Sequence, residues 1–115
     1  MAIDLYAGIP VTDFAAALEW YSRLFGCPPD LLAGESEAVW DLAEHRSVYI
    51  RVQPTHAGHA MHNIFVDDLD AVIDELEKQG LQPAKLETYP NGVRKATYYD
   101  PDGNETGFGG GPLDT

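Results

Sequence analysis

The sequence contains little cysteine, little positive charge and no long hydrophobic run. Cys27 is its single cysteine, so no disulfide can form within the chain and nothing requires an oxidising compartment. No apolar stretch reaches the ~18 residues that a membrane span needs. The N-terminal segment MAIDLYAG has no basic region and an acid at Asp4, which argues against a secretory signal. We therefore expect a cytoplasmic protein with no membrane partner.

Basic residues are also scarce. Seven Lys and Arg residues stand against nineteen Asp and Glu residues, for a formal net charge of −12 at pH 7. Such a surface repels a phosphate backbone, so we expect no nucleic acid partner. It would concentrate cationic small molecules near the protein, although the acids are scattered and solubility alone can account for them.

The sequence does contain an internal repeat. Segment 61–80, MHNIFVDDLDAVIDELEKQG, reads as an apolar strand followed by a helix that begins at an acid and ends at Gly80. Its core, VDDL at 66–69, corresponds to VTDF at 11–14, and the earlier helix also ends at a glycine, Gly26. A duplicated unit fixes the architecture, so we expect two similar halves.

Hydrophobic periodicity predicts the order β-α-β-β-β in each half. The elements located in the first half are a strand over 3–11, a helix over 14–25 capped by Asp13, and strands over 38–43 and 46–53. Those in the second half are a strand over 61–66, a helix capped by Asp67 or Asp68, strands over 84–89, 93–99 and 105–108, and a loose tail from residue 109. The fold class is therefore α+β, in one domain over 1–115 with modules at about 1–53 and 60–110.

The sheet face that carries no helix is the candidate binding surface, because it must meet the other half, a partner chain or a ligand. Strand alternation and aromatic content select the ligand-binding candidates Tyr6, Trp40, Tyr49, Arg51, Met61, Asn63, Phe65 and Glu105. Trp40 fits either face of its strand. Arg51 could clamp a carboxylate or lie in solvent. The alternative role for the aromatic candidates is packing in a core or a dimer interface.

Several segments resemble the vicinal oxygen chelate superfamily, which includes glyoxalase I, extradiol dioxygenases, fosfomycin resistance enzymes and bleomycin-binding proteins. These segments are the paired helix starts at 11–13 and 66–70, the helix end YSRLFG at 21–26, and YYDPDGN at 98–104 before the last strand. The resemblance covers nearly the whole chain. It implies two βαβββ modules that form a cup-shaped half barrel, and a homodimer.

The resemblance also implies where a metal would bind. In metal-dependent members, ligands occupy four strand positions that point into the cup. Three of these positions hold Tyr6, Met61 and Gly107 in this sequence, and the fourth falls within 46–53, which has no carboxylate. A phenol, a thioether and a missing side chain do not supply the donors that divalent metals prefer, so we expect no metal and no cofactor. A less favoured alternative is a metal site of His62 and Glu105, which needs a bulge to turn His62 into the cup.

Three functions remain open from the sequence. The favoured one is a metal-free protein of the sequestration or resistance type, which binds a hydrophobic or cationic small molecule in an aromatic-lined cup. The second is a glyoxalase-like lyase or isomerase, or another metal-dependent or dioxygenase-type enzyme, with a nonstandard site around Tyr6, His62 and Glu105. The third is a structural or regulatory dimer whose cup is filled by side chains.

Overall fold

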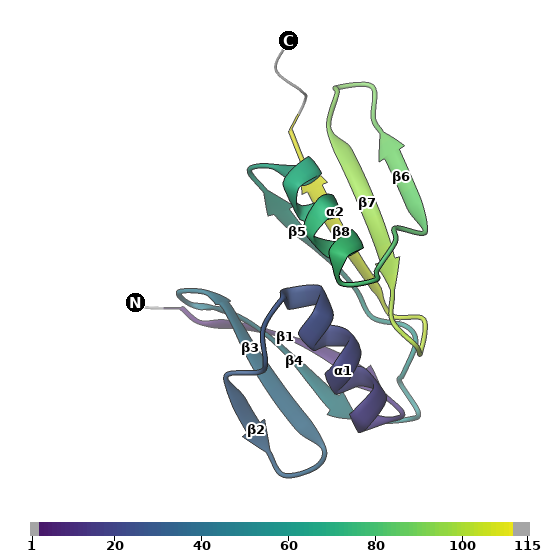
Figure 1. The fold of residues 1–115 in the computed structure, drawn as a ribbon. Helices are drawn as coiled ribbons and strands as arrows, with labels where there is room; N and C mark the ends of the chain where they lie inside the picture. Colours follow the sequence, from purple (N-terminus) through teal and green to yellow (C-terminus); the bar gives the residue numbers. More distant parts are fainter. Residues whose placement is uncertain (1–2, 112–115) are drawn as a thin grey trace.

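The computed structural model describes residues 3–111 and contains two βαβββ modules (Figure 1). The first module consists of β1 (Leu5–Val11), α1 (Phe14–Phe25), β2 (Leu31–Ala33), β3 (Glu37–Ala43) and β4 (Arg46–Val52). The second consists of β5 (Met61–Val66), α2 (Leu69–Lys78), β6 (Lys85–Thr88), β7 (Arg94–Tyr99) and β8 (Glu105–Gly110). The predicted α+β fold with a repeated unit is confirmed.

Both helices begin where an aspartate can cap them. The carboxylates of Asp13 and Asp68 accept hydrogen bonds from the backbone amides of Ala16 and Ala71, each at 3.1 Å. These bonds satisfy amides that have no partner within the first helical turn. Gly26 ends α1 with a φ of 72°, a left-handed conformation that glycine adopts without a Cβ clash. Within residues 3–111, neither helix has the length and apolar character needed to cross a membrane.

Two elements differ from the sequence prediction. The short strand β2, whose three residues are all exposed, pairs with β3 but gives no periodic signal. The last strand continues through Gly109 to Gly110, because both residues pair with β7. Glycine carries no side-chain pattern, so the sequence assigned these positions to the tail. The rest of that predicted tail, residues 112–115, lies outside the described residues.

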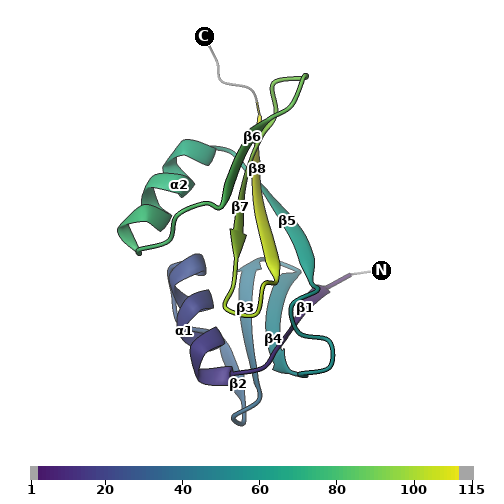
Figure 2. The same cartoon turned by 90° about the vertical axis from the view of Figure 1, so that its right-hand side faces the viewer.

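Each module forms its own mixed sheet, with strand orders β1-β4-β3-β2 and β5-β8-β7-β6. The first and last strands of each module are parallel, and the other neighbours are antiparallel. Consequently β1 and β5 are both edge strands. Figure 2 shows α1 and α2 on the same side of the molecule, with one face of each sheet left uncovered on the other side. We call these uncovered surfaces the open faces.

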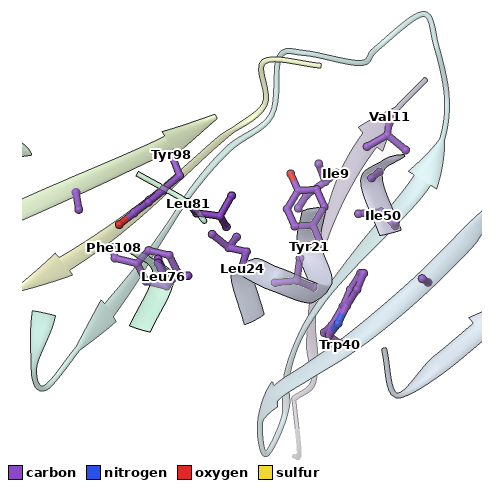
Figure 3. Close-up of a cluster of buried hydrophobic side chains, with 14 of the residues drawn as sticks. Ile9, Val11, Tyr21, Leu24, Trp40, Ile50, Leu76, Leu81, Tyr98 and Phe108 are labelled. Atoms are coloured by element: carbon purple, nitrogen blue, oxygen red, sulfur yellow. The ribbon is translucent and has the colours of Figure 1, made fainter. Parts of the chain in front are cut away.

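One hydrophobic core extends through both modules on the helix side of the sheets. In Figure 3, Leu24 of α1 lies between Tyr21 and the side chains of Leu76 and Leu81 from the second module. Trp40 and Tyr21 pack in the same cluster, with ring centroids 6.1 Å apart. The shared burial of apolar surface stabilises the contact between the modules.

A polar cluster also joins the modules, and we call it the inter-module latch. It consists of Pro10, Thr12 and Tyr21 from the first module and Asp100, Asp102 and Asn104 from the turn before β8. The amide and hydroxyl of Thr12 donate to the Asp102 carboxylate at 3.0 and 2.6 Å. These aspartates therefore connect segments that are far apart in the chain.

Asn104 lies at the centre of the latch and is fully buried. Its side-chain amide donates to the Pro10 carbonyl at 2.8 Å and to Asp100 at 2.9 Å. Its side-chain carbonyl accepts from the amides of Gly58 and Ala60, both at 3.0 Å, which fixes the linker between the modules. Every hydrogen-bonding group of this side chain is therefore satisfied.

The Tyr21 hydroxyl donates to the Asp100 carboxylate at 2.8 Å in the interior. Burial raises the pKa of Tyr21 well above its ordinary value of 10.0, and the Asp100 charge raises it further. The hydroxyl therefore stays protonated at physiological pH and remains a donor in the latch.

Candidate functional site

The open faces carry all the predicted ligand-binding residues except Trp40. Strand register places Tyr6, Tyr49 and Arg51 on the first open face, where the Tyr49 ring lies over Gly8. It places Met61, Asn63, Phe65 and Glu105 on the second open face. This arrangement follows from strand alternation, which the sequence displays clearly in β1, β4 and β5. Their role in binding remains a prediction.

Large apolar side chains on the open faces are strongly exposed. The exposed fractions are 57% for Tyr6, 72% for Met61 and 69% for Phe65. Single exposed apolar residues are common on proteins, but a group on one side of a molecule marks an interaction surface. The open faces are therefore the candidate functional site.

Trp40 lies on the helix side, and its predicted place in a ligand pocket is wrong. It is 1% exposed, its ring centroid is 5.5 Å from that of Phe25, and its indole N–H donates to the Cys27 carbonyl at 3.0 Å. The sequence could not decide which strand face carries Trp40, because Ala38, Val39 and Trp40 are all apolar. The structure buries all three residues. Consecutive burial removes the alternation that would have assigned the face.

His62 also lies on the helix side, opposite to Glu105. Its Nε2 is 3.0 Å from the Thr106 hydroxyl, whereas Glu105 pairs in register with Met61 on the open face. The pairing of β5 with β8 is regular, so no bulge turns His62 into the cup. The suggested metal site of His62 and Glu105, and the enzyme site that adds Tyr6, are therefore not assembled.

The environment of His62 predicts a pH dependence of stability. Burial lowers the pKa of His62 below its ordinary value of 6.5, against smaller opposing effects of Asp100 and Glu105. The unfolded chain therefore takes up this proton at a higher pH than the folded chain. The free energy of unfolding should fall as the pH drops from about 7.5 to about 5, and His62→Gln should reduce that fall.

Urea unfolding of the wild-type protein and the variant at both pH values measures this effect. The matched control is His59→Gln in the exposed linker, which should keep the wild-type pH dependence. The interpretation of His62 is wrong if both variants respond to pH as the wild-type protein does.

The metal-ligand positions of the family do not fit a divalent cation in this chain. A Cβ atom on Gly107 would overlap the Asn63 side-chain oxygen and would lie 2.5 Å from Lys95 Cε. The space at this position therefore holds an amide and the stem of a lysine, whose ammonium repels cations. Tyr6 and Met61 offer a neutral phenol and a thioether. Within residues 3–111, no group of three or more His, Cys, Asp or Glu side chains could hold a metal ion.

A polar cluster on the second open face was missed by the sequence analysis. Lys95 Nζ lies 3.7 Å from a Glu105 oxygen, and the Tyr99 hydroxyl donates to the other Glu105 oxygen at 3.3 Å. Both charged side chains are about four-fifths buried. The alternation of Lys95, Thr97 and Tyr99 along β7 is the signal that could have placed Lys95 on this face.

A cleft of about 480 Å³ lies between β5 and the first module. Most of its strand residues face the helix side, and it reaches the second open face at Asn63 and Phe65. This volume lies within the range of about 300–1,000 Å³ that is common for small-molecule sites. Its lining is mostly apolar. It includes Asn63 and Phe65 of the predicted ligand-binding residues, and His62 of the alternative metal site. The residues that line it are Leu5, Ala7, Leu42, Ala43, Arg46, Ser47, Val48, His62, Asn63, Ile64 and Phe65.

Comparisons with known proteins agree with this geometry. Residues 3–108 match the family model described as Glyoxalase/Bleomycin resistance protein/Dioxygenase superfamily. A glyoxalase / bleomycin resistance protein from Catenulispora Acidiphila DSM 44928 is 52% identical, with a TM-score of 0.93 over 96% of this chain and 100% of that one. A search of curated proteins gave no match.

Two further solved structures share the fold. TnmS3, an antibiotic binding protein from Streptomyces sp. CB03234, is 26% identical, with a TM-score of 0.72 over 96% of this chain and 97% of that one. A lactoylglutathione lyase from Agrobacterium tumefaciens is 19% identical, with a TM-score of 0.75 over 96% of this chain and 93% of that one. The latter likeness concerns the fold alone.

Proposed function

We propose that this chain, which belongs to the Glyoxalase/Bleomycin resistance protein/Dioxygenase superfamily, binds an apolar small molecule in a sequestration or resistance role. The observation that carries the proposal is the group of exposed apolar side chains on the open faces, next to a cleft of ligand size. The similarity to an antibiotic binding protein supports it. The fold alone could not, since one fold serves many functions.

We propose further that binding requires no metal or other cofactor and takes place in the cytoplasm. The donor types at the family's ligand positions support the first point, because Tyr6, Met61 and Gly107 provide neither imidazole nor carboxylate. The single cysteine is compatible with a reducing compartment.

The open face should govern ligand affinity. In a thermal-shift screen of antibiotics and natural products, we expect saturable binding that EDTA does not abolish. Tyr6→Ala and Asn63→Leu should each weaken the binding of a hit by about tenfold, since each removes a contact on the open face. Titration calorimetry of the wild-type protein and the variants measures the change.

Leu86→Ala is the matched control for this screen. Leu86 is 60% exposed, and its register with Ala96 directs it to the helix side of the second sheet. The control should keep wild-type affinity. A screen without any hit would remove the main support for a binding function, and equal effects of all three variants would place binding elsewhere.

We also propose that the protein is a homodimer whose partner encloses the open faces. Both open faces look to the same side of the chain and not toward each other (Figure 2), so one chain alone leaves them uncovered. Within the described residues, β1 and β5 each lack a strand neighbour on their outer edge. Unpaired strand edges with exposed apolar residues such as Leu5 and Met61 favour pairing with another chain.

Light scattering coupled to size exclusion should give a mass twice that of the 12.6 kDa chain. Leu5→Asp at the β1 edge should weaken association by at least about tenfold, because it places a charge in an apolar contact. Leu86→Asp, at a residue of similar exposure on β6, at the edge of the second sheet opposite to β5, should leave the dimer intact. A monomeric wild-type protein would contradict the proposal.

A further inference from the structure

The polar cluster beside the cleft indicates the chemistry of one end of the ligand. We propose that Lys95 and Asn63 form a subsite for an acidic head group, a carboxylate or a phenolate, on a ligand whose apolar body lies in the cleft. This inference rests on the proposed binding function and adds the chemical class of the ligand.

The two side chains converge on one point of the second open face. Asn63 Oδ1 and Lys95 Cε both approach the position that a Cβ atom of Gly107 would occupy, so the amide and the lysine stem are neighbours. The Phe65 ring comes within 3.3 Å of the corresponding position at Gly109. The Asn63 amide group, the lysine and an apolar ring therefore lie side by side, and Asn63 and Phe65 both line the cleft.

The N–H groups of this subsite remain available for hydrogen bonds to a ligand. Among residues 3–111, neither Lys95 Nζ nor the Asn63 side-chain amide has a hydrogen-bond partner. The 3.7 Å between Lys95 Nζ and Glu105 allows an ion pair but exceeds hydrogen-bond length. The Lys95 side chain is only 22% exposed, whereas Asn63 is exposed. A partly buried ammonium favours an incoming acceptor, and an oxyanion forms the strongest bonds with it.

The open faces differ in charge from the rest of the protein. Strand register directs three of the seven basic residues to them, but only four of the nineteen acidic residues. The basic ones are Arg51, Lys85 and Lys95, and the acidic ones are Glu37, Asp41, Glu87 and Glu105. Salt weakens the repulsion from acidic residues on the rest of the surface over a Debye length of about 8 Å. An anionic group on the open faces is therefore tolerated.

A cationic head group is the alternative that the overall charge of the protein favours. Glu105 is the acid nearest to the cleft residues on this face, and it already has two partners, Lys95 and the Tyr99 hydroxyl. A cation would have to displace Lys95 from Glu105, whereas an anion can use the remaining protons of the ammonium. The geometry therefore favours the acidic head group.

Three naphthalene compounds with one ring body and different head groups test this inference. The compounds are 2-naphthoate, 2-naphthamide and 2-naphthylmethylammonium, titrated into the full chain by calorimetry. We expect naphthoate to bind about tenfold more tightly than naphthamide, as a hydrogen bond to a charged group provides. Lys95→Met should abolish this preference without changing the affinity for naphthamide.

Two variants control for charge and position. Lys95→Arg keeps the positive charge and should retain the preference, which also guards against a folding defect in Lys95→Met. Lys85→Met removes another lysine of the same face and should leave the preference unchanged. Phe65→Ala should weaken the binding of all three compounds equally, because the ring contacts their shared body.

The outcomes separate the two proposals. Equal affinities for naphthoate and naphthamide, or tighter binding of the ammonium compound, would overturn the head-group inference and leave the binding function in place. Absence of saturable binding by all three compounds would also overturn the inference. The binding function itself would fall only if the antibiotic and natural-product screen gave no hit either.

Discussion

Replacing Asn104 with alanine should lower the free energy of unfolding by about 3–5 kcal/mol, a large effect for one substitution. The side chain is fully buried and makes four hydrogen bonds, at 2.8 to 3.0 Å. Its removal leaves the partly buried Pro10 carbonyl and the partly buried amides of Gly58 and Ala60 without these partners. Urea unfolding followed by circular dichroism measures the loss.

Asn91→Ala is the matched control for this prediction. Asn91 also sits in a turn between strands, but it is exposed and makes one side-chain hydrogen bond, to the Val93 amide at 3.1 Å. Its replacement should lower stability by less than about 1 kcal/mol. If Asn104→Ala is no more destabilising than this control, then the latch does not stabilise the junction between the modules.

Replacing Trp40 with alanine should also lower the free energy of unfolding by about 3–5 kcal/mol, because it opens a cavity among the Tyr21 and Phe25 rings. The affinity of the folded protein for ligands should not change, because Trp40 lies on the helix side. Chemical unfolding and calorimetric titration of the same preparation measure both quantities.

Tyr6→Ala should give the opposite result. Tyr6 is 57% exposed on the first open face, so its loss should change stability by about 0.5 kcal/mol or less while ligand affinity falls. A loss of affinity in Trp40→Ala at temperatures where the variant is fully folded would contradict the helix-side assignment. The pair thus separates packing from binding for two aromatic residues that the sequence treated alike.

Local patterns predicted the helices and most of the strands. An aspartate before each helix supplies the cap, and the apolar spacing in α1 and α2 reports which side is buried. Where one strand face is buried, alternation also assigned the open face correctly, as for Tyr6, Met61 and Phe65. In β3, consecutive apolar residues show no alternation, so the sequence could not assign Trp40 to one face of the strand.

The latch shows a second limit of local reasoning. The residues of the DPDGN turn resemble an ordinary tight turn in the sequence, and Asp100 does accept hydrogen bonds from the Asp102 and Asn104 amides. The Pro10 carbonyl that Asn104 contacts is 94 residues away in the chain. No periodicity or spacing within the turn could reveal that partner.

The sequence by itself determined the repeated βαβββ order, the helix caps and the residues that share a strand face, because these depend on neighbours a few positions away. The tertiary structure alone decided that His62 and Trp40 face the helices, that Lys95 lies beside Asn63, and that Asn104 joins the two modules. These outcomes depend on strand register and on packing between distant segments. The contacts that stabilise them join residues far apart in the chain, and no local sequence pattern identifies such pairs.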